Sequence, residues 1–300
     1  MQSYLPYIDR TTASELLQVV GSRLISDRRG GNSSAYIVDD YCVLKTGNIP
    51  LRDNGIDYPL HNVIESLHEF KENGVNVVPI LGYIYNDDQI KDHINSSYTT
   101  GYIIQDRAKG AELWDSKKLP TWSSASQENL DYIIDMLNTL VHAPQEHFNK
   151  FVEDYRKIDN KLMIDPSKQS NFFYDQQLGF SFIDLKFTVQ DKRWELQDLY
   201  GNDSHRFFIS DILSATLLRN CFDSSLIPND LLPIVTKGNQ LICAKTINAL
   251  MSAGITKENI LDAFSSQETY NGSSSGFSAF GIDEEFVTNL FQKESPATIE

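Results

Sequence analysis

Cysteine is scarce in this 300-residue chain, and Cys42, Cys221 and Cys243 lie far apart in the sequence. An odd and scattered count argues against a disulfide framework and against a metal site built on a CxxC pair. The histidines form no HExxH pattern, so a structural zinc is not indicated, and no GxSxG nucleophile elbow occurs. These absences exclude several common kinds of enzyme site.

Long apolar runs and basic residues are also few. No segment approaches the roughly 18 apolar residues of a membrane helix, and the N-terminal MQSYLPYIDR lacks the apolar region of a secretory signal. The 26 Lys and Arg face 41 Asp and Glu, which gives a formal net charge of -15. This field repels phosphate backbones, so we expect no nucleic acid and no membrane as partner, whereas a basic protein would be attracted. We expect a cytoplasmic protein, or one delivered into a host cytosol by a route without a Sec-type signal.

What the chain does contain is enough apolar material for a sizeable core, since hydrophobic residues make up 41%. The first hundred residues read mainly as strands. AYIV and YCVLK flank Asp39 and Asp40 as a β-hairpin would, and VVPILGYIYND and TTGYIIQDRAKG form two further strand-like segments. Between them, YPLHNVIESLHEFKENG has helical periodicity, with Pro59 at its start and Gly74 as its stop.

From about Ser124 the periodicity becomes helical. Two strand-like runs, NFFYD and GFSFID, interrupt it around QQLG and predict a hairpin, whereas residues 270–281 have the composition of a flexible loop or linker. The segments expected to be helices are SQENLDYIIDMLNTLVHAP, EHFNKFVEDYRKI, RFFISDILSATLLRNCF, NQLICAKTINALMSAG, TKENILDAFSS and DEEFVTNLFQKE.

Three constellations could carry chemistry. In DRRGGNSSAY, the backbone around Gly30, Gly31, Asn32 and Ser33 can approach a phosphate closely, although two glycines between strands more often form a plain hairpin turn. Lys45 ends an apolar strand, and it becomes interesting only with a carboxylate partner.

The candidate partner is Glu65 on the next helix, and Glu69, one turn further on and on the same face, is the alternative. If Lys45 and one of these acids were buried together, they would form a charge-paired phosphate clamp. A solvent-facing lysine and a solvent-facing helix acid are the ordinary alternative.

The third constellation lies in MIDPSKQSNFFYDQQLGFSFIDLK. Asp165 can orient or deprotonate a hydroxyl and Lys168 can neutralise phosphate charge, while the oxygens of Asn171 and Asp184 suit Mg²⁺. The hairpin would bring Asn171 and Asp184 close together. An Asx-turn followed by a structural hairpin is the alternative for the same residues.

Over about residues 20–190, the chain resembles the protein kinase-like fold. The resemblance lies in the order of its features, which are the glycine hairpin, the strand lysine, the helix glutamate, the linker, the Asp-Lys-Asn segment and the apolar-Asp pair. The resemblance implies an α+β, bilobal protein: a small β-rich N-lobe with one main helix (residues 1–106), a hinge at about 104–110, and a larger helical C-lobe (107–300) with catalytic and metal loops at 163–186. It implies ATP and Mg²⁺ as cofactors.

The resemblance also implies residue roles. Asp165 and Lys168 would be catalytic, and Asn171 and Asp184 would bind the metal. ATP would be bound by Gly30, Gly31, Asn32, Ser33, Lys45, Glu65, Gln105, Asp106 and Ala108, with the hinge residues contacting adenine through backbone groups.

The chain departs from the family pattern at several points. No His-Arg precedes Asp165, one extra residue separates Asp165 from Asn171, and Lys168 is one position late. Leu185 and Lys186 follow the metal Asp in place of Phe-Gly, and no A-P-E appears after it, so the usual peptide-docking segment is missing or rebuilt.

The sequence therefore leaves several functions open. The first is an atypical, bacterial-type protein kinase, of the effector kind, that phosphorylates a Ser, Thr or Tyr hydroxyl of a protein. The second is a small-molecule phosphotransferase of the aminoglycoside or choline kinase kind, which the missing A-P-E favours and the missing H-G-D loop disfavours. A pseudokinase that serves as a nucleotide-binding interaction module, and an enzyme that transfers AMP, are the remaining alternatives.

Overall fold

A computed structural model of the chain describes residues 24–29, 33–37, 42–50, 52–53, 56–57, 60–85, 98–114, 127–159, 161–164, 171–183, 185–187, 204–218, 227–265 and 280–293. By their internal contacts, the residues divide into two compact units. The first comprises Met1–Lys109 with Leu185–Phe187, and the second comprises Gly110–Asp184 with Thr188–Glu300.

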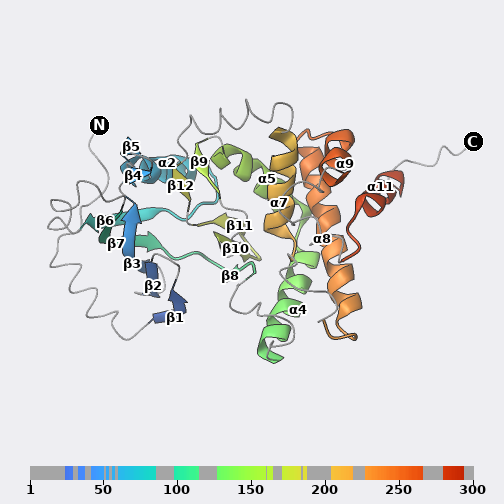
Figure 1. Ribbon diagram of the computed structural model, residues 1–300, viewed down its shortest axis with the longest axis horizontal. Coiled ribbons are helices and arrows are strands. Elements are labelled where there is room, and N and C mark those ends of the chain that lie inside the picture. Colours follow the sequence, from blue (N-terminus) through green and yellow to red (C-terminus); the bar gives the residue numbers. More distant parts are fainter. Residues whose placement is uncertain are drawn as a thin grey trace, which may run out of the picture. The chain divides into compact units, whose positions relative to one another are not determined.

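The first unit contains a five-stranded antiparallel sheet (Figure 1). Its strands, in spatial order, are β1 (Leu24–Arg29), β2 (Ser33–Ile37), β3 (Cys42–Pro50), β7 (Tyr98–Asp106) and β6 (Ile80–Tyr85). Ile37 pairs with Val43, so the hairpin predicted around Asp39 and Asp40 is confirmed. The two later strand-like segments are confirmed as β6 and β7, and these strands are hydrogen-bonded neighbours.

Helix α2 (Leu60–Glu72) stands between β3 and β6 in the chain, where the apolar spacing predicts it. Its buried face is formed by Val63, Ile64, Leu67 and Phe70. The helix ends as expected at Gly74, whose φ of 73° is the left-handed conformation that glycine adopts at low cost. The following Val75 N–H donates to Phe70 O over 2.8 Å, which satisfies one of the last helical carbonyls.

The second unit is mainly helical. Its hairpin, β10 (Phe172–Asp175) with β11 (Gly179–Phe182), is the one predicted around QQLG, and β8 (Ala111–Glu112) adds a third antiparallel strand. All six predicted helices are confirmed: α4 (Gln127–His142), α5 (Gln145–Asp159), α7 (Ser204–Thr216), α8 (Leu232–Ser252), α9 (Lys257–Ser265) and α11 (Glu284–Lys293).

Helix α8 begins earlier than the sequence pattern indicates. The predicted segment starts at Asn239, whereas the helix starts at Leu232 with Pro233 in its first turn, a position that proline tolerates because its missing N–H has no helical partner there. Buried polar side chains join it to α7 and to the residues that follow α7: Thr246 Oγ1 donates to Thr216 Oγ1 over 3.1 Å, and Asn239 Oδ1 accepts from the Leu218 N–H over 2.9 Å.

Five two-residue strands among the described residues are not predicted by the sequence pattern. They are β8, described above, and β4 (Arg52–Asp53), β5 (Ile56–Asp57), β9 (Leu162–Met163) and β12 (Lys186–Phe187). Two residues are too few to show an alternation of apolar and polar positions. Of the predicted linker at 270–281, only Phe280 and Gly281 fall inside the described residues.

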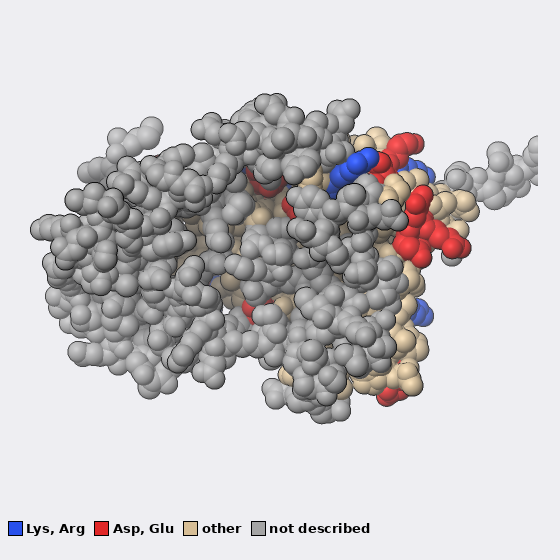
Figure 2. Space-filling view, in the orientation of Figure 1, with Lys and Arg blue, Asp and Glu red and all other residues tan. Residues whose placement is uncertain are grey.

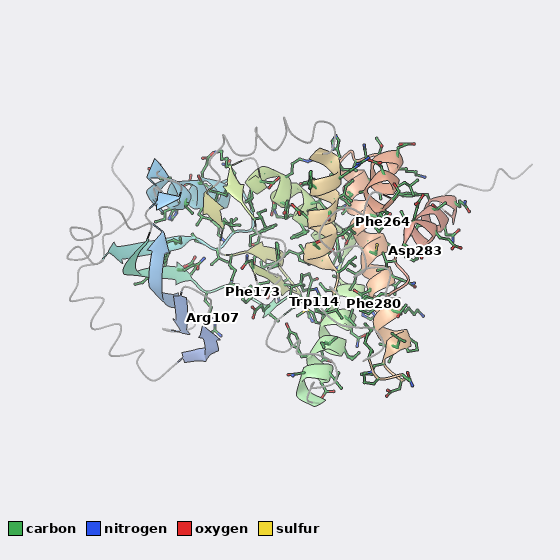
Figure 3. The ribbon with its side chains drawn as sticks, in the orientation of Figure 1. Arg107, Trp114, Phe173, Phe264, Phe280 and Asp283 are labelled. Carbon is green, nitrogen blue, oxygen red and sulfur yellow. The ribbon has the colours of Figure 1, made fainter. Side chains whose placement is uncertain are left out.

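Helix α11 shows how a local signal sets a helix start. Asp283 Oδ1 accepts a hydrogen bond from the Phe286 N–H over 2.8 Å, and Glu284 and Glu285 occupy the first turn, where the helix dipole favours negative charge. Figure 3 labels Asp283 beside this helix, and Figure 2 shows acidic side chains gathered over the same part of the molecule. Across the described ranges, no helix has the length and apolar character needed to cross a membrane.

Candidate functional site

The strand that carries Lys45 lies at the centre of the first unit's sheet. In the register of β3, Lys45 stands opposite Ala35 of β2 on one side and opposite Ile103 of β7 on the other. The loop of Gly30, Gly31 and Asn32 lies outside the described residues, but it joins β1 to β2, and Ser33 is the first residue of β2. The lysine position is therefore flanked by the glycine hairpin and by the strand that leads into the predicted hinge.

The two candidate partners of Lys45 lie on the exposed side of α2. Glu65 and Glu69 are both solvent-exposed, one helical turn apart, and neither belongs to the apolar face of the helix. The structure thus differs from a clamp in which the glutamate is buried. The Lys45 side chain is not among the described ones, so the choice between the two glutamates stays a prediction.

At the predicted hinge, the side chain of Gln105 is used within the fold. Gln105 is 5% exposed, and its Nε2 donates to Val78 O over 3.0 Å. The Asp106 N–H donates to Pro79 O, also over 3.0 Å, at the end of β7. These bonds fix the backbone at the start of the segment that runs to Ala108. The resemblance implies that backbone groups of this segment bind adenine.

Asp106 lies among charged groups of the same unit. Partial burial raises the pKa of its carboxyl above the ordinary value, and the positive charges of Lys71 and His68 oppose that rise. Both cationic side chains come from α2. The end of β7 and this turn of α2 are therefore electrostatic neighbours.

In the second unit, the hairpin places the backbone of Asn171 next to Ile183, the residue before Asp184. Phe172 pairs with Phe182, and one step further the Ile183 N–H donates to Asn171 O over 2.9 Å. Asn171 is 6% exposed, and Asp184 follows Ile183 directly in the chain, although it lies outside the described residues. An amide oxygen and a carboxylate at this spacing are hard donors of the kind that Mg²⁺ takes, so the residues fit the implied metal.

Aromatic rings of α5 pack against the hairpin. Phe151, which is 1% exposed, stacks on Phe182 with ring centroids 5.2 Å apart and contacts Phe172 and Phe180 at 5.9 Å and 4.7 Å. Because Phe172 adjoins Asn171 and Phe182 precedes Ile183, this packing fixes the backbone on which the predicted metal ligands stand.

The two predicted catalytic residues, Asp165 and Lys168, lie outside the described residues. The chain is described up to Ile164, which is 6% exposed. Their roles stay predictions from the resemblance. The described residues, which include neither Asp165 nor Asp184, contain no group of three or more His, Cys, Asp or Glu that could hold a metal.

Some notable side chains escaped sequence reasoning. His68 was assigned no role, yet its Nε2 lies 3.3 Å from Ile80 O. Glu112 and Trp114, the latter labelled in Figure 3, are 7% and 1% exposed in the strand and turn after the predicted hinge. Among the residues that the structure describes, the indole N–H of Trp114 finds no hydrogen-bond partner. An isolated Glu or His in a sequence carries no signal of burial, so these features required the structure.

Comparison with known proteins gives little support for a family. No protein-family model matches the chain, and no curated protein matches it. Among solved structures, a similar chain is the amicoumacin kinase hAmiN, determined in complex with AMP-PNP, Ca2+ and Ami. That match covers 95% of this chain and 94% of the other at 12% identity, with a TM-score of 0.30. Because this TM-score is too low to establish a common fold, the proposals below rest on the residues and the sheet topology.

Proposed function

We propose that the chain is an ATP-dependent phosphotransferase. The observation that carries the proposal is the position of β3: its Lys45 lies between the strand that ends the glycine hairpin and the strand that leads into residues 105–110. Neighbouring strands are about 4.8 Å apart, and this spacing supports the proposal that a phosphate-binding loop, a cation and a backbone hinge would serve one nucleotide.

In this proposal, the first unit binds ATP. Backbone N–H groups at Gly30, Gly31, Asn32 and Ser33 would cradle phosphate oxygens, and Lys45 would neutralise their charge. Glu65 or Glu69 would orient Lys45. Backbone groups between Asp106 and Ala108 would bind adenine, while the Gln105 side chain stays buried against Val78 O.

The second unit would hold the metal and the acceptor. Asn171 and Asp184 would be the Mg²⁺ ligands, and bound Mg²⁺ would supply positive charge to the phosphate chain. Asp165 would accept the proton of the acceptor hydroxyl, whose oxygen bonds to the γ-phosphorus as the bond to the ADP oxygen breaks. Lys168 would offset charge on the transferred group.

For the acceptor, we propose the hydroxyl of a small molecule. The support is the segment after Asp184, which contains no A-P-E and leads to α7 already at Ser204. Little chain is then left for the docking platform that a peptide substrate uses. A protein hydroxyl, the first reading of the sequence, becomes an alternative outcome of the test.

The test is transfer of label from γ-labelled ATP in the presence of Mg²⁺, with separate pools of hydroxyl-bearing small molecules and of proteins as acceptors. We expect label on a small molecule, and a rate reduced roughly 100-fold or more in Asp165→Asn, because the general base is lost. Asp230→Ala, which removes an exposed carboxylate elsewhere, serves as the control and should transfer label normally.

Other outcomes discriminate among the alternatives. Label on protein alone would overturn the small-molecule acceptor but keep the phosphotransferase. Label transferred only from α-labelled ATP would indicate AMP transfer. ATP binding without any transfer would indicate a pseudokinase, and the absence of both binding and transfer would overturn the proposal as a whole.

A further inference from the structure

Three consecutive carbonyl groups after α2 are each engaged by the residues around them. Val78 O accepts from Gln105 Nε2 over 3.0 Å, and Pro79 O accepts from the Asp106 N–H over 3.0 Å. His68 Nε2 lies 3.3 Å from Ile80 O and donates to it in the tautomer that carries the proton on Nε2. We call Val78, Pro79 and Ile80 the carbonyl clip.

The carbonyl clip joins two elements that the proposed function uses separately. His68 belongs to α2, the helix that carries Glu65, whereas Gln105 and Asp106 end β7 at the proposed adenine site. The clip is buried at all three positions, so its carbonyls depend on protein donors more than on water. A shift of either element would leave a buried carbonyl without its donor.

The surrounding charges strengthen the same connection. Lys71 and His68 of α2 both act on the Asp106 carboxyl, opposing the rise that burial causes in its pKa. The bonds to the clip and the charges around Asp106 therefore link one turn of α2, at His68 and Lys71, to the last two residues of β7.

We propose that Gln105 and His68 are positioning residues that, through the carbonyl clip, make α2 and the adenine-binding end of β7 move as one piece. Occupation of the adenine site then orders α2, and with it Glu65, before any phosphate reaches Lys45. This inference rests on the proposed function, since it assigns a coupling within the same nucleotide site.

Adenosine is the discriminating probe because it carries no phosphates and so cannot reach α2 through Lys45. We expect adenosine to slow amide hydrogen exchange not only at residues 103–108 but also in α2, by a factor of roughly 5, the lower end of usual coupling between sites. The measurement is hydrogen exchange of the full chain with and without adenosine.

Two His68 variants separate positioning from mere stability. His68→Gln keeps an N–H donor at about the reach of Nε2, and we expect it to retain the slowing in α2. His68→Leu removes the donor, and we expect it to keep adenosine binding but to lose the slowing in α2. His142→Leu, which removes a histidine hydrogen-bonded to Asn138 O in the second unit, is the matched control and should behave as wild type.

A second measurement needs no ligand. In a thermal-unfolding cycle of His68→Leu and Gln105→Met, we expect the double variant to lose clearly less stability than the sum of the single losses, because both bonds act on one segment. Additive losses would overturn the coupling. An equal effect of adenosine on α2 in wild type and His68→Leu, or an effect confined to residues 103–108 in wild type, would overturn it as well.

Failure of the inference and failure of the proposed function look different. If wild type binds neither adenosine nor ATP, the proposed function is wrong, and so is the link between an adenine site and α2. The thermal-unfolding cycle then still decides whether the carbonyl clip couples α2 to β7. If nucleotides bind and α2 does not respond to adenosine, the proposed function stands and the positioning role of His68 and Gln105 is wrong.

Discussion

At the scale of single residues, Gly110 is the glycine at which an added carbon meets the closest contacts among the described glycines. Its φ is +82°, and a Cβ built there would overlap the backbone of Tyr174 and Asp175. This close approach lets the chain entering β8 lie against β10. Only glycine satisfies both the backbone conformation and the contact.

We therefore expect Gly110→Ala to destabilise the protein by at least about 3 kcal/mol, since a clash with backbone adds to the left-handed strain of roughly 1–2 kcal/mol. Gly254→Ala is the control. Gly254 has a φ of +86° but open space around the added carbon, so the loss should be the strain alone. Urea unfolding of both variants measures the difference, and equal losses would contradict the contact at Gly110.

Tyr174 provides a prediction on pH. Burial, and to a smaller extent the charge of Asp175, raises the pKa of Tyr174 to about 12, and its hydroxyl is paired with His147 Nδ1 over 2.9 Å. Because the folded pKa lies above the unfolded value of about 10, the protonated hydroxyl of Tyr174 stabilises the folded protein fully below pH 10. This contribution to the free energy of unfolding is lost as the pH rises through the folded pKa.

Between about pH 9 and pH 11, wild type should accordingly lose more stability than Tyr174→Phe, which has no hydroxyl to ionise in the unfolded chain. The measurement is the urea midpoint of both proteins at the two pH values. Other tyrosines and lysines titrate equally in both proteins, so they cancel in the difference. Parallel losses would show that the hydroxyl of Tyr174 has an ordinary pKa.

The residues of the candidate site show what sequence can and cannot predict at this scale. The pairing that places Asn171 beside Ile183 follows from the alternation of NFFYD and GFSFID, which fixes the hairpin register. The exposure of Glu65 and the buried bond of Gln105 do not follow from any local pattern. The first depends on which face α2 turns to the core, and the second on the carbonyl of Val78, which is 27 positions away in the chain.

At the scale of elements, α5 and the β10–β11 hairpin form one aromatic cluster. Phe151 of α5 contacts the rings of Phe172, Phe180 and Phe182, and Tyr155 adds a contact to Phe182 at 6.2 Å. Aromatic pairs of this kind add to the free energy gained by burial alone. The hairpin therefore depends on α5 for its position.

We expect Phe151→Ala to destabilise the protein by about 3–5 kcal/mol, since it empties the centre of this cluster. Leu178→Ala in the hairpin turn is the control: Leu178 is 49% exposed, so the change should cost less than about 0.5 kcal/mol. Chemical unfolding of the two variants provides the comparison. A loss below about 1 kcal/mol in Phe151→Ala would contradict the supporting role of α5.

Helices and hairpins were predictable because their signals are periodic and long. The six helices of the second unit each span at least two turns of amphipathic spacing, and the N-terminal strands are bounded by Gly or Asp turns. The start of α8 was missed because its first turns, LPIVTK, are apolar without a clear polar face and contain a proline. The two-residue strands are set by their pairing partners, which a local pattern does not reveal.

At the scale of the whole molecule, the formal net charge of -15 opposes the binding of a nucleotide, which is itself an anion. Local positive charge must overcome this field. Under the proposed function, Lys45 and Mg²⁺ bound by Asn171 and Asp184 would each supply such charge, so ATP affinity should depend strongly on both.

The most direct test of this claim is a calorimetric titration of the full chain with ATP, with and without Mg²⁺. We expect wild type to bind ATP at least about tenfold more tightly when Mg²⁺ is present, a difference of about 1.4 kcal/mol. Asp184→Ala should lose that Mg²⁺ dependence, and Lys45→Ala should bind ATP weakly in both conditions. The controls Asp230→Ala and Lys237→Ala should bind ATP as wild type does. Absence of ATP binding in wild type, or an undiminished Mg²⁺ effect in Asp184→Ala, would contradict the proposed nucleotide site.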